Sequence, residues 1–393
     1  MLRKDFVNKN FIYKIYTLLT TSILFAVNPL MSLYIFTFVK RSNFMKLIII
    51  LIGSFILLSK YFIGGDGDDI GNYINTFLHF DTFQNVLLVS AVHSGSIDII
   101  FWYLSYFVFL FTNNPVYFLF FWHFISLSLL YYSYNKILSK DAIFAFIIFI
   151  STTTFYYIYG NTLRQGFAVS LSVLILYYIL NKEIKKAYIL GLLSILVHPS
   201  SIIVLFAIYM RKFSFKIIYI SLFFSLFFQK ISILKLLGIL FSFVGLSHFA
   251  GKAIGYSEKF EPGSIFSFGT LIFFIIILTY VYGKYKLKKE IINTSLIKIY
   301  FSYQVIYFLF LNTSLASDRI FSYRAVLDPI LLIMLSYSFK QKILIKYFLV
   351  FIFMLLNIYY ILNIFNYVFY DNQYNLLSLN IIDLFELINK VGK

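Results

Sequence analysis

Long apolar runs recur from one end of the chain to the other, and short polar stretches separate them. Most runs reach about 18 residues, the length at which an α-helix crosses a hydrocarbon layer of roughly 30 Å. Apolar residues fill each run instead of alternating with polar ones, which argues against the strands of a membrane barrel. The pattern predicts membrane-spanning helices over residues 16–39, 44–62, 115–134, 141–159, 165–180, 187–209, 217–234, 264–283, 295–313, 325–339 and 346–368. We therefore expect an all-α fold, a polytopic transmembrane helical bundle of about 10–12 spans that forms a single integral membrane domain over residues 1–393.

Composition agrees with a membrane protein. Hydrophobic residues make up 61% of the 393 residues and charged residues only 12%, about half of the roughly 25% found in soluble domains. The net charge of +17 comes from Lys and Arg clusters between the apolar runs, which is typical of cytoplasmic loops. The charge therefore reports topology, and we expect no nucleic acid among the partners. The chain contains no cysteine, which excludes disulfides and thiol chemistry.

Charge also predicts which loops face outward. Loop 63–98 carries acidic residues but neither Lys nor Arg, so we expect it to be extracytoplasmic. With the later Lys clusters inside, residues 161–166 and 316–324 then lie on the outer side. We predict that stretch 235–263 is a second large extracytoplasmic loop, although it contains lysines. The basic N-terminus argues for a cytoplasmic start, which conflicts with an outer 63–98 loop unless the chain also bends near Asn28–Pro29. The many later loops carry more weight than this one tail.

Two segments do not read as simple spans. Residues 97–112 are short for a crossing, and we predict a re-entrant or interfacial helix on the outer side. His198–Pro199 interrupts the run 187–209, and proline breaks helices. We therefore predict two half-helices with His198 at the outer mouth, which keeps Arg211 and Lys212 inside.

The outer loops hold the residues that can carry chemistry, beginning with the Gly- and Asp-rich segment 64–73. Its oxygen ligands suit a divalent cation, but Phe77 stands where an EF-hand requires Glu. Asp66 and Asp68 resemble the DxD pair of nucleotide-sugar transferases, whose substrates are cytoplasmic. The alternative is a solvated acidic turn that enforces topology.

Three further segments carry cations or a histidine. Arg164 and Gln165 open an apolar helix, where helix N–H groups and a guanidinium favour an anion; the alternative is an Arg reaching lipid headgroups. His198 precedes Pro199 inside an apolar run, where a near-neutral imidazole suits proton transfer; the alternative is a structural histidine.

The last segment runs from Asp318 to Arg324, between two predicted spans. Arg319 and Arg324, flanked by aromatics, suit a phosphate-bearing or sugar ligand. The alternative is an ordinary loop in which Asp318 pairs with Arg319. Asp328 lies four residues after Arg324, which also permits an i,i+4 ion pair.

Common cofactor and metal motifs are absent. The five histidines form neither an HxxxH nor an HExxH spacing, and no P-loop, GxSxG or GxGxxG sequence occurs. We therefore expect no metal and no cofactor.

The order of these motifs resembles the EpsG-like branch of the Wzy-type polysaccharide polymerases, which make O-antigen or capsule from repeat units. The motifs that carry the resemblance are Asp69-x-x-x-Tyr73, Asp98, Arg164-Gln165-Gly166, His198-Pro199-Ser200 and Arg319-x-x-x-Tyr323-Arg324. The resemblance covers most of the chain. That family usually shows an Arg just before the Asp segment, where the nearest basic residue here is Lys60.

The resemblance implies a glycosyltransferase of the bacterial cytoplasmic (inner) membrane, multi-pass and metal-independent. It would transfer a glycan from polyprenyl diphosphate to a lipid-linked oligosaccharide repeat unit on the outer face. Its partners would be that lipid-linked glycan, membrane lipids, a chain-length regulator and a flippase. Cations would hold the diphosphate, and His198 or Asp69 would accept the proton of the attacking hydroxyl. The predicted substrate-binding set is Arg164, Gln165, Arg319, Arg324, Tyr73, Asp66 and Asp98.

Two other functions remain as alternatives. A ligase or another lipid-linked glycan transferase needs the same outer anion site. A flippase or transporter of lipid-linked oligosaccharide would line a central cavity with cations and show two similar halves, and no such repeat is visible.

Overall fold

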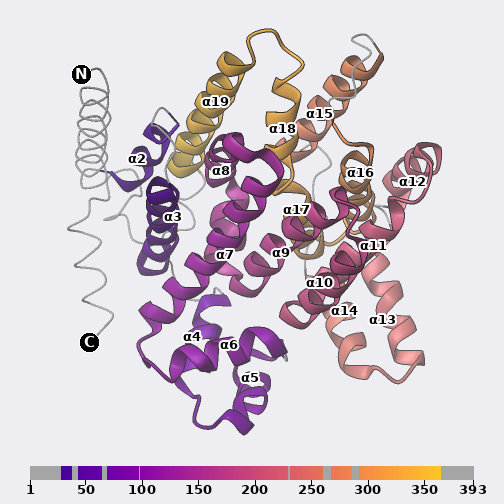
Figure 1. Cartoon of the computed structure of the whole chain (residues 1–393). Coiled ribbons are helices and arrows are strands. Elements are labelled where there is room, and N and C mark those ends of the chain that lie inside the picture. Colours follow the sequence, from indigo (N-terminus) through magenta and orange to yellow (C-terminus); the bar gives the residue numbers. More distant parts are fainter. Residues whose placement is uncertain are drawn as a thin grey trace, which may run out of the picture. The chain divides into compact units, whose positions relative to one another are not determined.

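The computed structural model describes residues 28–37, 43–63, 69–96, 98–228, 231–259, 267–285 and 292–363. These residues form helices and no strands (Figure 1), which confirms the predicted all-α fold. The chain divides into two compact units. Unit 1 contains the described parts of 1–135, 139–163 and 343–393, and unit 2 contains 136–138 and 164–342. The single domain over 1–393 stays a prediction.

Unit 1 is built from helices at the two ends of the chain. They are α2 (Pro29–Ile35), α3 (Asn43–Ile63), α4 (Asp69–Leu78), α5 (Val86–Ser94), α6 (Ile99–Phe109), α7 (Pro115–Leu138), α8 (Ala142–Ile150) and α19 (Lys342–Asn363), with short 3-10 turns at Phe83–Asn85 and Ser139–Asp141 and a π-helical turn at Phe155–Tyr159. Local sequence starts two of them. The Asn28 and Asn114 side chains each accept a hydrogen bond at 2.9 Å from a backbone N–H of the first turn, and a proline at the helix start needs no such bond.

Helices occupy most of the predicted outer loop 63–98 where the structure describes it. Ile70, Tyr73, Ile74 and Phe77 are buried on one side of α4, the i, i+3, i+4, i+7 spacing of an amphipathic helix. Their aromatic rings pack against α6 and α7, and the Phe77 and Phe118 rings stack at 4.5 Å between centroids. The re-entrant or interfacial helix predicted over 97–112 is α6, which bends from α5 by 109°.

Two polar contacts tie α19 into unit 1. Lys346 and Asp141 form an ion pair at 2.6 Å with both side chains almost fully buried. Asn357 donates a hydrogen bond to the Tyr34 hydroxyl at 2.9 Å, and this hydroxyl lies 2.8 Å from Ser151 Oγ. Polar groups inside an apolar bundle are costly unless they are paired, so these contacts help to fix the position of α19.

Unit 2 contains the remaining helices. They are α9 (Leu163–Leu180), α10 (Ile184–Val197), the turn Pro199–Ser201, α11 (Ile202–Met210), α12 (Phe215–Phe228), α13 (Ile233–Phe243), α14 (Ser247–Lys259), α15 (Phe268–Tyr285), α16 (Thr294–Leu309), α17 (Ser314–Ala325) and α18 (Asp328–Ser336). The predicted break at His198–Pro199 is confirmed, because α10 ends at Val197 and α11 begins at Ile202. The predicted outer segments 235–263 and 316–324 also contain helices, namely α13, α14 and α17.

Several described helices suit a membrane. Three are long and apolar enough to cross one: Pro115–Ile150, Leu163–Leu180 and Lys342–Ile361, with a fourth if α5 and α6 form one broken span. Shorter apolar helices accompany them at Asn43–Leu58, Pro199–Met210, Phe215–Phe227, Ile233–Phe243 and Gly269–Tyr282. The helical membrane bundle is therefore confirmed, and the number of spans stays a prediction.

Candidate functional site

Polar residues from three segments of unit 2 meet along one side of helix α17. The segments are the start of α9, the break between α10 and α11, and α17 itself. The residues are Arg164 and Gln165, then His198, Ser200 and Ser201, and finally Arg319, Ser322 and Tyr323. Three of the four predicted chemical segments therefore come together in the structure.

Gln165 connects α9 to α17. Its Nε2 donates hydrogen bonds at 2.8 Å to the Arg319 carbonyl oxygen and at 2.8 Å to Ser322 Oγ. The side chain is fully buried, so both amide N–H groups are used within the protein. Gln165 was predicted to bind substrate, and this packing instead favours a role in holding α17 against α9.

His198 caps the turn that follows it. Its Nδ1 accepts hydrogen bonds from the backbone N–H of Ser200 at 3.1 Å and lies 2.8 Å from Ser200 Oγ. A backbone N–H can only donate, so Nδ1 carries a lone pair and the proton of the neutral ring lies on Nε2. In this geometry His198 is a hydrogen-bond donor through Nε2.

Tyr323 links α17 to the same turn. Its hydroxyl lies 3.0 Å from Ser200 Oγ and 3.0 Å from Ser201 Oγ. Burial raises the pKa of Tyr323 to about 12, so the hydroxyl stays protonated near neutral pH. Tyr323 and Ser200 thus hold the His198 ring through a continuous set of hydroxyl contacts.

Two guanidinium groups give this cluster its positive charge. Arg164 and Arg319 are both half-buried, and both lie close enough to interact electrostatically with the His198 imidazole. The Arg319 side chain has no hydrogen bond or ion pair with any residue that the structure describes, and the alternative pair with Asp318 does not form there. An unneutralised arginine in a partly buried setting favours an anionic ligand.

Arg324 lies in a different environment from Arg319. It is fully buried, and its guanidinium donates to Gln304 Oε1, to the Gly269 carbonyl oxygen at 2.8 Å and to Asp328 at 3.4 Å. The permitted i,i+4 pair with Asp328 is thus confirmed. Any β-carbon at position 269 would collide with the Phe321 ring, which is why glycine stands there. The sequence also predicted that Arg324 binds substrate. That role stays a prediction, and the buried, hydrogen-bonded guanidinium does not favour it.

The acidic candidates belong to unit 1, whereas His198 belongs to unit 2. Asp69 is half-buried at the first position of α4, and Asp98 is buried at the start of α6. The Tyr73 ring is buried and lies 5.7 Å from the Phe101 ring centroid, so it cannot stack on a sugar in this conformation. Asp66 lies outside the described residues.

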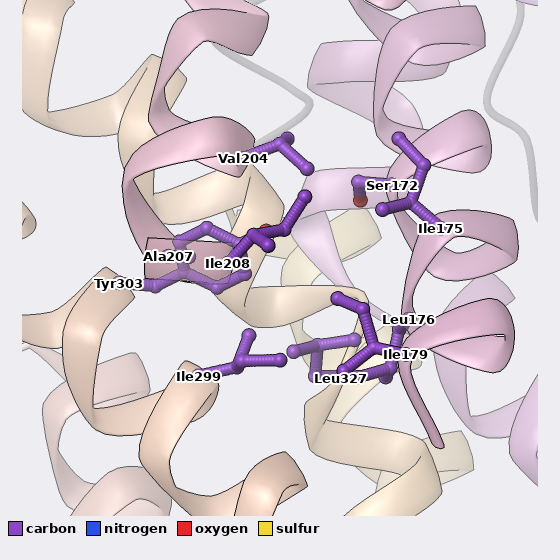
Figure 2. Close-up of a pocket in the computed structure, with 10 residues that line it drawn as sticks. All are labelled: Ser172, Ile175, Leu176, Ile179, Val204, Ala207, Ile208, Ile299, Tyr303 and Leu327. Atoms are coloured by element: carbon purple, nitrogen blue, oxygen red, sulfur yellow. The ribbon is translucent and has the colours of Figure 1, made fainter. Parts of the chain in front are cut away.

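An apolar cavity lies deeper in unit 2 (Figure 2). Its lining residues are Ser172, Ile175, Leu176, Ile179, Val204, Ala207, Ile208, Ile299, Tyr303 and Leu327. The volume of about 10 Å³ suits one water molecule, so the cavity cannot hold a sugar. No group of three or more metal-binding side chains occurs among the described residues.

Sequence reasoning assigned no role to Ser322 and Tyr323. Arg319, Ser322 and Tyr323 are spaced i, i+3, i+4, which places them on one face of a helix. That signal was available, but it has meaning only if residues 314–325 are expected to be helical.

Comparison with known proteins supports a role in polysaccharide synthesis. A family model described as the EpsG family matches residues 45–376. The chain is 32% identical over 144 residues to the EPS I polysaccharide export inner membrane protein EpsF of Ralstonia solanacearum, covering 35% of this chain and 34% of that protein. The protein of that name from Ralstonia nicotianae is 30% identical over 148 residues, covering 36% and 35%. The matched region therefore spans about a third of the length of these relatives. No solved structure matches the chain at a significant level.

Proposed function

Because the chain belongs to the EpsG family, a Wzy-like polysaccharide polymerase family, we propose that it polymerises lipid-linked repeat units into a polysaccharide. The family membership and the similar proteins support a role in polysaccharide biosynthesis at a membrane. The proposed reaction transfers a glycan from polyprenyl diphosphate to the next lipid-linked oligosaccharide on the outer face of the bacterial cytoplasmic membrane. The observation that carries the proposal is the cluster of Arg164, Arg319 and His198, in which the Arg319 guanidinium has no protein partner among the described residues.

This cluster suits a diphosphate leaving group. In the proposed transfer, the acceptor hydroxyl oxygen forms a bond to the anomeric carbon, and the bond from that carbon to the diphosphate breaks. The diphosphate leaves with the electron pair and gains negative charge. Fixed guanidinium groups stabilise such charge without reorganising during the reaction. Arg164 and Arg319 supply that stabilisation.

His198 serves the same anion as a donor. With Nδ1 occupied by Ser200, its Nε2–H is the group available to a phosphate oxygen. The proton lost by the acceptor hydroxyl then requires a different base. Asp69 remains the candidate for this base that the sequence suggested, since a carboxylate can accept the proton.

Two substitutions at position 198 distinguish the role of Nδ1, which accepts from Ser200 and caps the turn, from the role of the Nε2–H donor. His198→Asn places an acceptor oxygen near the position of Nδ1, keeps the cap and removes the Nε2–H. We expect polymer formation to fall about 10- to 100-fold at a normal level of folded protein, since one charge-assisted hydrogen bond is lost.

His198→Gln is the matched control, because it extends a donor toward the Nε2 position but loses the cap. We expect it to lose about 1 kcal/mol of stability and to keep more activity per folded molecule than the Asn variant. The measurement is polymer length on a gel, normalised to folded protein by size-exclusion chromatography. Wild-type polymer from His198→Asn would remove the donor from the mechanism.

The function itself is tested by deleting the gene and examining the glycans. Polymerisation requires that the ladder of chain lengths disappears while single repeat units still reach the cell surface. Accumulation of single units on the cytoplasmic side would instead identify a transporter. Full-length polymer that remains on its lipid carrier would identify a ligase.

A further inference from the structure

A second group of cations surrounds Phe215 in unit 2, away from the α17 cluster. The ends of α11 and α15 and the starts of α12 and α16 contribute to it. The Nζ atoms of Lys298 and Lys284 lie 5.3 Å and 5.4 Å from the centroid of the Phe215 ring. Lys298 also donates a hydrogen bond to the Arg211 carbonyl oxygen at 3.3 Å. We call Arg211, Lys284 and Lys298 around Phe215 the basic junction.

Two cations of the basic junction have unused donors. The Arg211 Nε is buried and has no hydrogen-bond partner among the described residues. Lys298 is half-buried, and it donates one hydrogen bond to a described residue, so two of its three ammonium N–H groups have no partner among the described residues. Neither side chain forms an ion pair within the part of the chain that the structure describes.

Two other lysines of the chain each form an ion pair with a carboxylate. Lys346 pairs with Asp141, and Lys186 pairs with Glu183. Partly desolvated cations without a counter-charge are costly. Arg211 and Lys298, which have no carboxylate partner among the described residues, are therefore suited to an anion from outside the protein.

The surface next to the basic junction identifies the kind of anion. Tyr209, Ile217, Ile220 and Tyr282 lie on the same helices within a few residues of these cations, and all are exposed. In a membrane protein such side chains contact acyl chains. The charge pattern of the sequence also predicts that this end of α11 and α15 faces the cytoplasm. An anion site next to a surface that contacts acyl chains fits the phosphate of a phospholipid better than a soluble anion.

We propose that the basic junction binds the headgroup phosphate of an anionic phospholipid in the cytoplasmic leaflet. Arg211 and Lys298 contact the phosphate, and Lys284 adds positive charge from α15. This inference does not depend on the proposed glycan transfer, since it concerns different residues.

The test uses the purified, delipidated full-length chain, titrated with phosphatidylglycerol or phosphatidylcholine in mixed micelles. Native mass spectrometry counts the bound lipids. We expect a preference of about fivefold or more for phosphatidylglycerol, because each surface cation contributes about 1 kcal/mol to such binding. If the wild-type protein binds the two lipids equally, this titration alone overturns the proposal, and no variant is needed.

Variants locate the site. The double substitution Arg211→Gln/Lys298→Gln is expected to abolish the preference. Lys140→Gln/Lys185→Gln removes the same charge from exposed positions elsewhere and is expected to retain it. An equal loss in both doubles would mean that net charge alone attracts the lipid. Lys298→Arg is a second variant that tests the site even if the first double variant folds poorly. It keeps the positive charge, so we expect it to keep the preference for phosphatidylglycerol. Loss of that preference in Lys298→Arg would overturn the phosphate contact.

Soluble anions separate a lipid from a free phosphate. Inorganic phosphate and glycerol phosphate are added to the wild-type protein with bound phosphatidylglycerol. We expect neither to displace the lipid at equal concentration, since neither contacts the apolar surface. Displacement by either would assign the basic junction to a soluble anion.

Discussion

Replacing Arg319 by alanine is expected to lower polymer formation by about 100- to 1,000-fold, the loss measured when one group that stabilises transition-state charge is removed. The Arg319 side chain makes no hydrogen bond or ion pair with the described residues. Its removal therefore breaks no hydrogen bond or ion pair with the described residues. The measurement is polymer per folded molecule, from the gel ladder and the level of protein in the membrane.

Two controls accompany Arg319→Ala. Arg319→Lys keeps the charge but loses the forked geometry, and we expect an intermediate activity. Lys185→Ala removes an exposed cation outside the cluster and is expected to leave the ladder unchanged. An undiminished ladder from Arg319→Ala would show that the α17 cluster does not hold the leaving group.

Arg324→Met is expected to destabilise the protein by about 3–5 kcal/mol, because it leaves a buried carboxylate without its counter-charge. Asp328 loses the contact at 3.4 Å, and among the described residues it keeps the Tyr300 hydroxyl, which donates to it at 2.6 Å. The measurement is the midpoint of thermal unfolding in detergent, followed by the fraction of monodisperse protein.

The matched double variant distinguishes a buried charge from a lost side chain. Arg324→Met/Asp328→Asn removes both charges and retains an oxygen that can accept from Tyr300. We expect it to recover most of the stability lost by Arg324→Met alone. If Arg324→Met unfolds at the same midpoint temperature as the wild-type protein and loses only polymer formation, Arg324 acts on the substrate.

These two arginines show what a local pattern can and cannot predict. Arg319 and Arg324 are five residues apart, which places them about 140° apart around a helix. One therefore borders the polar cluster, and the other enters the packed interior of unit 2. As a loop, the segment offered two equivalent arginines; as helix α17, it separates them.

Helix α17 was missed for a physical reason. Its polar sequence lies between two apolar runs, and polar segments between spans are expected to be loops. What makes it a helix with a buried side is contact with residues distant in the chain, such as Gln165, 154 positions before Arg319. Such contacts leave no periodic signal in a single sequence.

Features controlled by neighbouring residues were predicted well. The break at His198–Pro199 follows from the missing N–H and fixed φ of proline. The Arg324–Asp328 pair follows from helical spacing. The arrangement of Asp69 and Asp98 relative to the cations depends on how distant segments pack, so their roles remain predictions.

The attachment of α17 sets a condition for exchanging segments between family members. Gln165 needs a carbonyl oxygen at position 319, which any backbone supplies, but also a hydroxyl at 322. The turn after His198 needs the Tyr323 hydroxyl. A chimaera that imports residues 314–325 from a relative should therefore dock correctly only where the donor sequence has Ser or Thr at the position of Ser322 and Tyr at that of Tyr323. All other donors would need residues 164–165 and 198–201 to be transplanted together with the helix.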